Sequence, residues 1–397
     1  FADLLMPRWA GLHPIHGCTP SDFPDRGSRY EKLAWKPNLL SGVALWFTRA
    51  MSASPRATLL ALALFAAAVG LTQSFALRDG DTFWNIRAGL VLLERGSLPA
   101  HDVLTHTAGD RPWIHHEWGA QLLWAAAYEL GGWAAVRGLR ALLVVALVAL
   151  WLTLVRRILR PGGAGWGLTL AAVTAGWVAL MPHVSARPRL LGWVLYALAC
   201  WLFFAAARRW SWRRYAAFFL FAVGWFNVHS SALLLPLTAG LELANALVSE
   251  LWARLRSRET RPWRDLVPAA LRTALATIAL LLQPAGFALV GYILETPTLN
   301  REYSSEWWPL WRADVWQQHP AIIVVAALLA SITLLSIVAR WRRGASPASD
   351  TGSSFPSPLT ALAFVALALY SRRMTAQLII VALFTARELW SWPTLRA

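Results

Sequence analysis

The chain has 397 residues, of which 57% are hydrophobic and 15% charged, and its formal net charge is +16. This composition is too apolar for a soluble protein of that length. A positive net charge can indicate nucleic-acid binding, but here the basic residues lie in short clusters between apolar runs and not on one soluble face, which argues against it. The two cysteines, Cys18 and Cys200, form no motif, which argues against a disulfide framework or a cysteine-rich zinc site.

Residues 1–50 differ from the rest of the chain. They contain both lysines, Lys32 and Lys36, and show no sustained hydrophobic period. Met51 opens a short polar stretch before the first long apolar run, as a natural start would. We therefore expect residues 1–50 to be a non-native or disordered extension and residues 51–397 to be a membrane domain.

From residue 51 onward, apolar runs alternate with polar loops. The runs fall near residues 58–77, 134–155, 165–183, 190–207, 214–228, 231–249, 266–283, 320–339, 358–371 and 374–390. A helix needs roughly 17–25 apolar residues to cross a bilayer core. We therefore predict an all-α fold, a polytopic transmembrane bundle of about ten spans.

Short arginine clusters occupy alternate loops between these runs. The clusters are Arg156, Arg157 and Arg160; Arg208, Arg209, Arg213 and Arg214; Arg254, Arg256, Arg258, Arg261 and Arg264; and Arg340, Arg342 and Arg343. Cytoplasmic loops of membrane proteins carry an excess of Lys and Arg. We therefore expect these loops and both termini in the cytoplasm, and the loop 78–118 on the outer face.

The long outer loop 78–118 contains helix-like segments. Phe83, Ile86, Leu90 and Leu93 share one face of a short helix, which is typical of a helix lying in the membrane interface. A second interfacial helix is predicted within residues 113–130, before the break at Gly131 and Gly132.

Charged residues at the outer ends of the runs are the candidates for chemistry. Asp79 and Asp81 follow the first run, and a carboxylate there can take a proton from an acceptor hydroxyl. An arginine within or near the membrane costs free energy unless it is paired or binds a ligand. A guanidinium group can donate two parallel hydrogen bonds to a phosphate. The outward arginines are Arg187, Arg189, Arg372 and Arg373.

Structural roles compete with these interpretations. Asp81 stands just before a helix and could cap it, and Arg187 and Arg189 could be ordinary headgroup arginines. A divalent metal is the weaker alternative, because the acids and histidines of the loop match no strong metal motif. These residues are His101, Asp102, His106, His115, His116 and Glu117.

Several motifs follow one another in order along the chain. Residues 79–85 read Asp-Gly-Asp-Thr-Phe-Trp-Asn, residues 96–102 read Gly-Ser-Leu-Pro-Ala-His-Asp, and residues 109–118 read Gly-Asp-Arg-Pro-Trp-Ile-His-His-Glu-Trp. Later landmarks are Ala186-Arg187-Pro188, Asn227-Val-His229, Pro284-Ala-Gly286, Glu306-Trp307 and Ser371-Arg372-Arg373. Together they resemble bacterial multi-pass proteins of the GT-C glycosyltransferase superfamily, including mannosyltransferase-like proteins.

The chain departs from that family pattern at several positions. Asn85 and Met374 stand where histidine is common, and Gln283 replaces an asparagine. Ser230 and Ser231 replace a glycine pair. If these positions touch substrate, the substrate has changed or activity has been lost.

The resemblance implies a GT-C-type glycosyltransferase (hexosyl- or pentosyltransferase) of the bacterial inner membrane. Such enzymes move a sugar from a polyprenyl-phosphate carrier to an acceptor at the outer face. It implies that Asp79 is the base, with Asp81 as second acid, and that the four outward arginines hold the carrier phosphate. The sugar or acceptor pocket would be lined by Trp113, His116, Glu117, Asn227 and His229.

This interpretation predicts a polyprenyl-phosphate-sugar donor and membrane lipids as partners, and no nucleic acid, metal or cofactor. The donor sugar and the acceptor are not identified by the sequence. Two alternatives stay open. A transporter or flippase for a lipid-linked sugar would need the arginines but no base, and it often shows inverted repeats, of which we find none. An inactive membrane scaffold would need neither.

Overall fold

The computed structural model describes residues 79–106, 111–159, 177, 184–204, 210–255, 266–318, 320–342 and 356–390. All of them belong to one compact unit, Thr58–Ala397. The predicted extension 1–50 and the run 58–77 lie outside the described residues, as does the run 165–183 apart from Trp177. Within the described ranges the protein is all-helical, and its only β-type pairing is an isolated bridge between His101 and Pro112. The all-α class is therefore confirmed.

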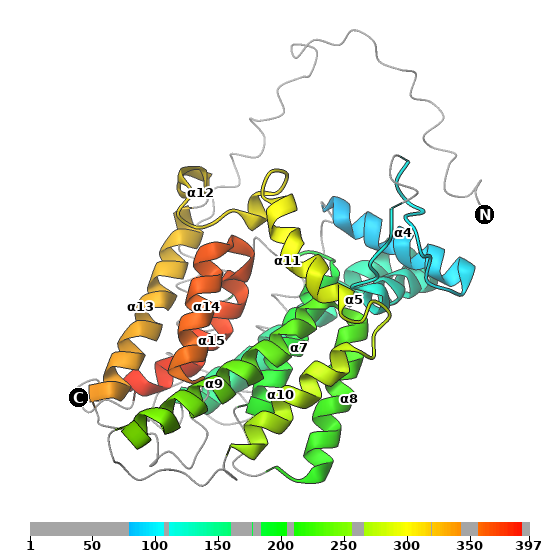
Figure 1. Cartoon of the computed structure of the whole chain (residues 1–397). Helices are drawn as coiled ribbons and strands as arrows, with labels where there is room; N and C mark the ends of the chain where they lie inside the picture. The colour runs from blue at the N-terminus through cyan, green and yellow to red at the C-terminus, as the bar shows by residue number, and fades with distance from the viewer. Residues whose placement is uncertain are drawn as a thin grey trace, which may run out of the picture. The chain divides into compact units, whose positions relative to one another are not determined.

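Figure 1 shows the arrangement of the described helices. The α-helices are α4 (Gly80–Arg95), α5 (Trp118–Leu159), α7 (Pro188–Ala199), α8 (Trp212–Val228), α9 (Leu234–Leu255), α10 (Val267–Leu280), α11 (Ala288–Asn300), α12 (Ala313–Gln318), α13 (Pro320–Arg342), α14 (Pro358–Tyr370) and α15 (Thr375–Trp390). A π-helical turn, η5 (Cys200–Phe204), extends α7, and 3-10 turns form η6 (Ser230–Leu233), η8 (Ser305–Trp307) and η9 (Arg372–Met374).

The predicted apolar runs within the described ranges coincide with helices α5, α7, α8, α9, α10, α13, α14 and α15. Two further helices, α11 and α12, were not predicted. α11 has Pro297 inside it, and α12 has only 6 residues, so neither carries the long unbroken apolar run on which the prediction relied.

Two of the described helical segments are long and apolar enough to cross a membrane, Trp118–Val155 and Ser230–Leu255. Shorter apolar helices are Pro188–Phe204, Val267–Leu280, Ile322–Val338 and Pro358–Tyr370. Length and composition thus support membrane spanning for these two segments, fewer than the roughly ten spans predicted from the sequence.

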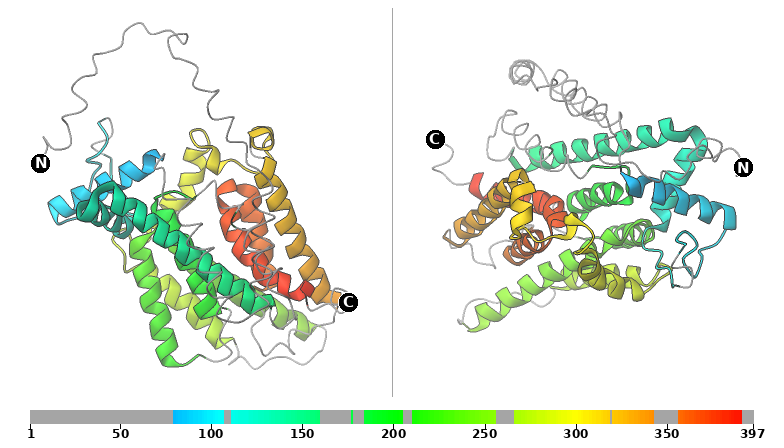
Figure 2. Two further views of the ribbon diagram at one scale, coloured as in Figure 1. Left: turned by 180° about the vertical axis from the view of Figure 1, so that it is seen from behind. Right: turned by 90° about the horizontal axis from the view of Figure 1, so that it is seen from above.

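The predicted break at the glycine pair is present inside α5. Gly131 has φ −165° and ψ 26°, and Gly132 has φ 57° and ψ −148°. The second conformation lies in a region that favours glycine. The first part of α5, Trp118 to Leu130, is therefore a separate helical arm, and α4 packs against this arm (Figure 2).

Close backbone approach holds α4 on that arm. A Cβ atom placed on Gly89 would lie 2.1 Å from the backbone oxygen of Gln121, so only glycine fits there without movement. Asn85 is buried beside it, donates to the Asp81 carbonyl at 2.8 Å and accepts from Gln121 Nε2 at 3.3 Å. The position of Asp79, at the start of α4, follows from this packing.

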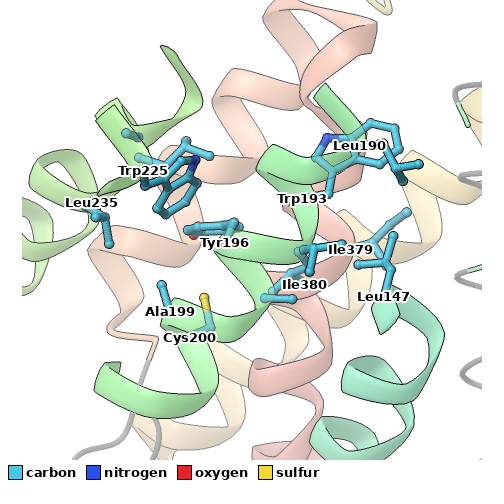
Figure 3. Packing of buried hydrophobic residues seen from close by; sticks show 14 of the residues in the cluster. Leu147, Leu190, Trp193, Tyr196, Ala199, Cys200, Trp225, Leu235, Ile379 and Ile380 are labelled. Atoms are coloured by element: carbon cyan, nitrogen blue, oxygen red, sulfur yellow. The ribbon is translucent and has the colours of Figure 1, made fainter. Parts of the chain in front are cut away.

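The main core surrounds α7, which contacts α5, α8, α9 and α15. Trp193, Tyr196 and Cys200 of this segment are almost fully buried. Side chains from the neighbouring helices surround them, including Leu147, Trp225, Leu235, Ile379 and Ile380 (Figure 3). The core keeps the N-terminus of α7, where Arg187 and Arg189 lie, in a defined position.

Candidate functional site

Asp79 is the N-cap of α4. Its backbone is extended, and its Oδ1 accepts a hydrogen bond from the Asp81 amide at 3.1 Å. A side-chain acceptor of this kind satisfies one of the free amides at a helix start. The sequence suggested Asp81 as the capping residue, but the cap is Asp79, two residues earlier. The Asp81 carboxylate is exposed and turns towards Arg187.

Arg187 links three acidic side chains. Its Nε and Nη2 donate to the two carboxylate oxygens of Asp79, a two-point contact. Its Nη1 lies 2.8 Å from Asp81 Oδ2 and 3.7 Å from Glu306 Oε1. Burial disfavours the charged form of Asp79, but hydrogen bonding and attraction to Arg187 outweigh it, so the pKa of Asp79 is lowered.

Glu306 binds the second arginine of the same segment. Arg189 Nη1 lies 2.5 Å from Glu306 Oε2, and Arg189 Nη2 lies 3.3 Å from Oε1. Burial opposes ionisation of Glu306, but the charges of Arg189, Arg373 and Arg187 and the hydrogen bonding from Arg189 lower its pKa to about 2. Glu306 belongs to one of the sequence motifs but was not predicted to be a site residue.

The turn η9 places Arg372 and Arg373 next to the segment that contains Glu306. Backbone hydrogen bonds from Arg372 N to Trp308 O (3.0 Å) and from Leu310 N to Leu369 O (2.9 Å) dock this turn on the segment around η8. Arg372 is buried and donates to Ser305 Oγ at 3.3 Å. Its Nε and Nη1 have no hydrogen-bond partner among the described residues.

Arg373 stacks on an aromatic ring, with its guanidinium carbon 4.7 Å from the centroid of Trp307. Burial, followed by the charge of Arg189, lowers the pKa of Arg373 to about 10. Within the described ranges, neither Arg372 nor Arg373 has a carboxylate within 4.0 Å. Their charges are therefore less neutralised than those of Arg187 and Arg189.

Glu117, immediately before α5, lies between two histidines. Its Oε2 is 3.7 Å from His116 Nε2 and 3.6 Å from His229 Nε2. His229 is buried between α8 and η6. Burial lowers the pKa of His229 well below its usual value, and the charge of Arg373 acts in the same direction. His229 is therefore neutral at pH 7.

Two predicted pocket residues make local contacts. The Asn227 amide donates to the carbonyls of Val223 (2.9 Å) and Leu282 (3.0 Å), so it ties the end of α8 to the segment after α10. Trp113 stacks on His115 with ring centroids 4.9 Å apart. Among the described residues, neither side chain has a hydrogen bond or ion pair with the acidic and basic residues described above.

Several departures from the family pattern also have local roles. Asn85 bridges α4 and α5, as described above. Gln283 closes its own turn, donating to the Gly286 carbonyl at 2.8 Å and accepting from the Ala285 amide at 2.9 Å. Ser231 hydrogen-bonds His229. Each of these three residues therefore has a local hydrogen-bonding role.

The predicted acids and histidines of the outer loop do not assemble around a common point. Asp102 accepts from the amides of Leu104 and Thr105 and from the Thr105 hydroxyl, and His115 Nε2 lies 2.5 Å from the Pro99 carbonyl. In the part of the chain that the structure describes, no three His, Cys, Asp or Glu side chains cluster as metal ligands would.

The described residues of two basic clusters lie at the opposite ends of their helices from this site. Arg213 and Arg214 begin α8, which has 17 residues and ends beside His229. At about 1.5 Å per residue, that separates them from His229 by about 25 Å. Arg254 likewise ends α9, a helix length away from η6. In Figure 1, α4, α11 and α12 lie towards the top, and the far ends of α9 and α13 lie towards the bottom.

Comparisons with protein-family models, curated protein sequences and solved structures gave no match. The functional argument therefore rests on the residues themselves. The arrangement offers guanidinium groups for an anion beside carboxylates for a proton, supplied by the starts of α4, α5 and α7 and by η8 and η9.

Proposed function

We propose that the protein is an integral membrane glycosyltransferase that moves a sugar from a polyprenyl-phosphate carrier to an acceptor. The observation that carries this proposal is the position of Arg372 and Arg373. Both are partly or fully buried, both lack a carboxylate within 4.0 Å in the described residues, and both lie beside Glu306. Guanidinium groups in a partly dehydrated setting bind a phosphate strongly.

The chemistry that this site suits is displacement of a phosphate from a sugar. The acceptor oxygen forms a bond to the anomeric carbon, the bond from that carbon to the carrier phosphate breaks, and the acceptor proton passes to a carboxylate. Negative charge grows on the leaving phosphate, and Arg372 and Arg373 stabilise it as it grows. The family resemblance assigns the proton to Asp79, with Asp81 as second acid.

The outer face of a bacterial inner membrane is the proposed location. Support comes from the two helices that are long enough to cross a membrane and from the basic clusters at the far helix ends. Since basic clusters favour the cytoplasm, the end that carries Asp79 and Arg373 would face outward. A polyprenyl chain could remain in the bilayer while its phosphate reaches these arginines.

The test uses a change in one arginine and a matched control. Arg373→Ala removes a guanidinium that is proposed to contact phosphate, whereas Arg312→Ala removes an exposed arginine that also stacks on a tryptophan, 4.0 Å from the Trp308 ring. A charge-assisted hydrogen bond contributes about 1.5–3 kcal/mol, so Arg373→Ala should weaken polyprenyl-phosphate binding about 10- to 100-fold. Arg312→Ala should leave binding unchanged.

Both binding and turnover should be measured with the full chain in proteoliposomes. The substrate is radiolabelled polyprenyl-phosphate-mannose, followed by a panel of polyprenyl-phosphate hexoses and pentoses, and the product measured is free polyprenyl phosphate. Carrier binding without release from any donor would favour a transporter or flippase for a lipid-linked sugar. Absence of both binding and release would favour an inactive scaffold.

A further inference from the structure

Glu117 has an environment unlike that of the other acids in the site. Asp79, Asp81 and Glu306 each have a guanidinium nitrogen within 2.8 Å, whereas among the described residues the nearest cationic or imidazole nitrogens to Glu117 are two imidazole Nε2 atoms at 3.6 and 3.7 Å. Both distances are longer than a hydrogen bond. The carboxylate is nevertheless largely enclosed, with 16% of its side chain exposed.

The hydrogen bonds of His229 define which of its nitrogens faces Glu117. The Ser231 amide donates to His229 Nδ1 at 3.0 Å, and Ser231 Oγ lies 2.7 Å from the same atom. An amide can only donate, so Nδ1 is the acceptor and the proton of the neutral ring is on Nε2. That N–H group is on the side of Glu117, 3.6 Å from its Oε2.

Close packing holds this histidine in place. A Cβ atom on Gly192 of α7 would lie 2.3 Å from Ser231 Oγ and 3.0 Å from His229 Nδ1. Trp225 Nε1 also donates to Ser231 Oγ at 3.1 Å. The turn between α8 and η6 is therefore fixed by α7 on one side and by a buried tryptophan on the other, which keeps the Nε2 position constant.

Asp79 is less suited to accept a proton in the same structure. Both of its carboxylate oxygens bind Arg187, and Oδ1 also accepts from the Asp81 amide. A carboxylate with a lowered pKa is a weaker base than one free of such a partner, since base strength follows pKa. Asp79 instead orients Arg187, which makes it a positioning residue.

We propose that Glu117 is the proton acceptor in the sugar transfer. This assignment rests on the proposed glycosyltransferase function. In the step, the acceptor O–H bond breaks and its proton goes to Glu117 Oε2, while the acceptor oxygen bonds to the anomeric carbon. The electron pair of the broken sugar–phosphate bond leaves with the phosphate, which Arg373 and Arg372 hold.

The other charged or titratable groups facing Glu117 are consistent with that step. His116 packs against Tyr292, with ring centroids 4.7 Å apart, and Arg373 lies close enough to interact electrostatically with Glu117. Glu117 thus has two imidazoles within 4.0 Å and interacts electrostatically with the arginine that would contact the leaving phosphate. A base and a leaving-group site must both be near the anomeric carbon, and the electrostatic interaction between Arg373 and Glu117 is consistent with that requirement.

The experiment compares carboxylate-to-amide changes at two acids with a control. Glu117→Gln keeps the shape but cannot accept the proton, so kcat for release of polyprenyl phosphate should fall about 10²–10⁴-fold while polyprenyl-phosphate affinity is retained. Asp79→Asn should instead raise KM for the donor and lower kcat much less, because it disturbs Arg187. Glu94→Gln, in an exposed pair with Arg87 on α4, should leave both constants unchanged.

A further variant guards against misfolding. Glu117→Asp keeps a base at a shorter reach and should retain more activity than Glu117→Gln, with the same elution volume as wild type on size exclusion. Turnover by Glu117→Gln at the wild-type rate would overturn the assignment of Glu117 alone. A kcat loss confined to Asp79→Asn would return the role of base to Asp79. Absence of release by wild type with every donor would instead overturn the glycosyltransferase function, and the assignment with it.

Discussion

Arg187 and Asp79, which are 108 residues apart in the sequence, form a two-point ion pair between the start of α7 and the start of α4. Each side chain is about one-fifth exposed, so the pair is shielded from solvent but not fully dehydrated. Asp79 also caps α4. One carboxylate therefore determines both how α4 begins and where the Arg187 guanidinium points.

Asp79→Asn should lower the stability of the protein. Asparagine caps a helix as well as aspartate does, so the change removes the charge and leaves the cap. Removing one partner of a buried pair costs about 3–5 kcal/mol, and partial exposure here reduces the expected loss to about 1–3 kcal/mol. Thermal unfolding in detergent should show it. The control is Asp314→Asn, whose partner Arg312 is exposed, and which should shift stability by less than about 0.5 kcal/mol.

Glu306 should make the protein sensitive to acid. Its pKa is about 2 in the folded protein against an ordinary value of 4.5, so its contribution is present above about pH 4.5. That contribution is lost as the pH falls towards about 2, and it amounts to at most about 3 kcal/mol. Wild type and Glu306→Gln should therefore differ in unfolding free energy at pH 6 and converge by pH 2. A constant difference across that range would contradict the ion-pair origin of the shift.

Gly89→Ala should destabilise the packing of α4 on α5. The added Cβ would lie 2.1 Å from a backbone oxygen and 2.6 Å from the attached carbon of Gln121, and neither atom can rotate away. Forcing an extra methyl group into a packed contact costs about 1–3 kcal/mol. Gly138→Ala is the control, because Gly138 lies in α5 and nothing lies within 4 Å of the added Cβ. It should stabilise the protein by about 0.5–1 kcal/mol. Unfolding of both variants in detergent measures the contrast.

Labelling of single cysteines tests the orientation of the chain. Ser97 follows α4 in the loop 78–118, which is predicted to face outward, and Leu255 is exposed at the far end of α9. In a background without Cys18 and Cys200, Ser97→Cys should react with a membrane-impermeant thiol reagent added outside cells. Leu255→Cys should react only after the membrane is opened, because it lies at the basic end. Labelling of both positions from outside would exclude the proposed topology.

The sequence by itself determined the class of the protein and where most described helices lie. Apolar runs of helix length, broken by glycine, proline and arginine clusters, predicted helices such as α8, α13 and α14 to within a few residues. It also singled out Asp79, Arg187 and Arg373 as unusual at those places. These properties are local, because backbone hydrogen bonding within a helix and the apolar content of a run depend only on nearby residues.

Tertiary structure alone decided which of these residues meet. The pairing of Arg189 with Glu306 joins positions 117 residues apart, and the proximity of Glu117 to His229 depends on how α5, α7 and α8 pack. It also brought the Asn227 amide to two backbone carbonyls and made Asp79 the N-cap of α4. No local pattern specifies such contacts, because a side chain's partner across the fold is selected by the burial and close packing of all helices together.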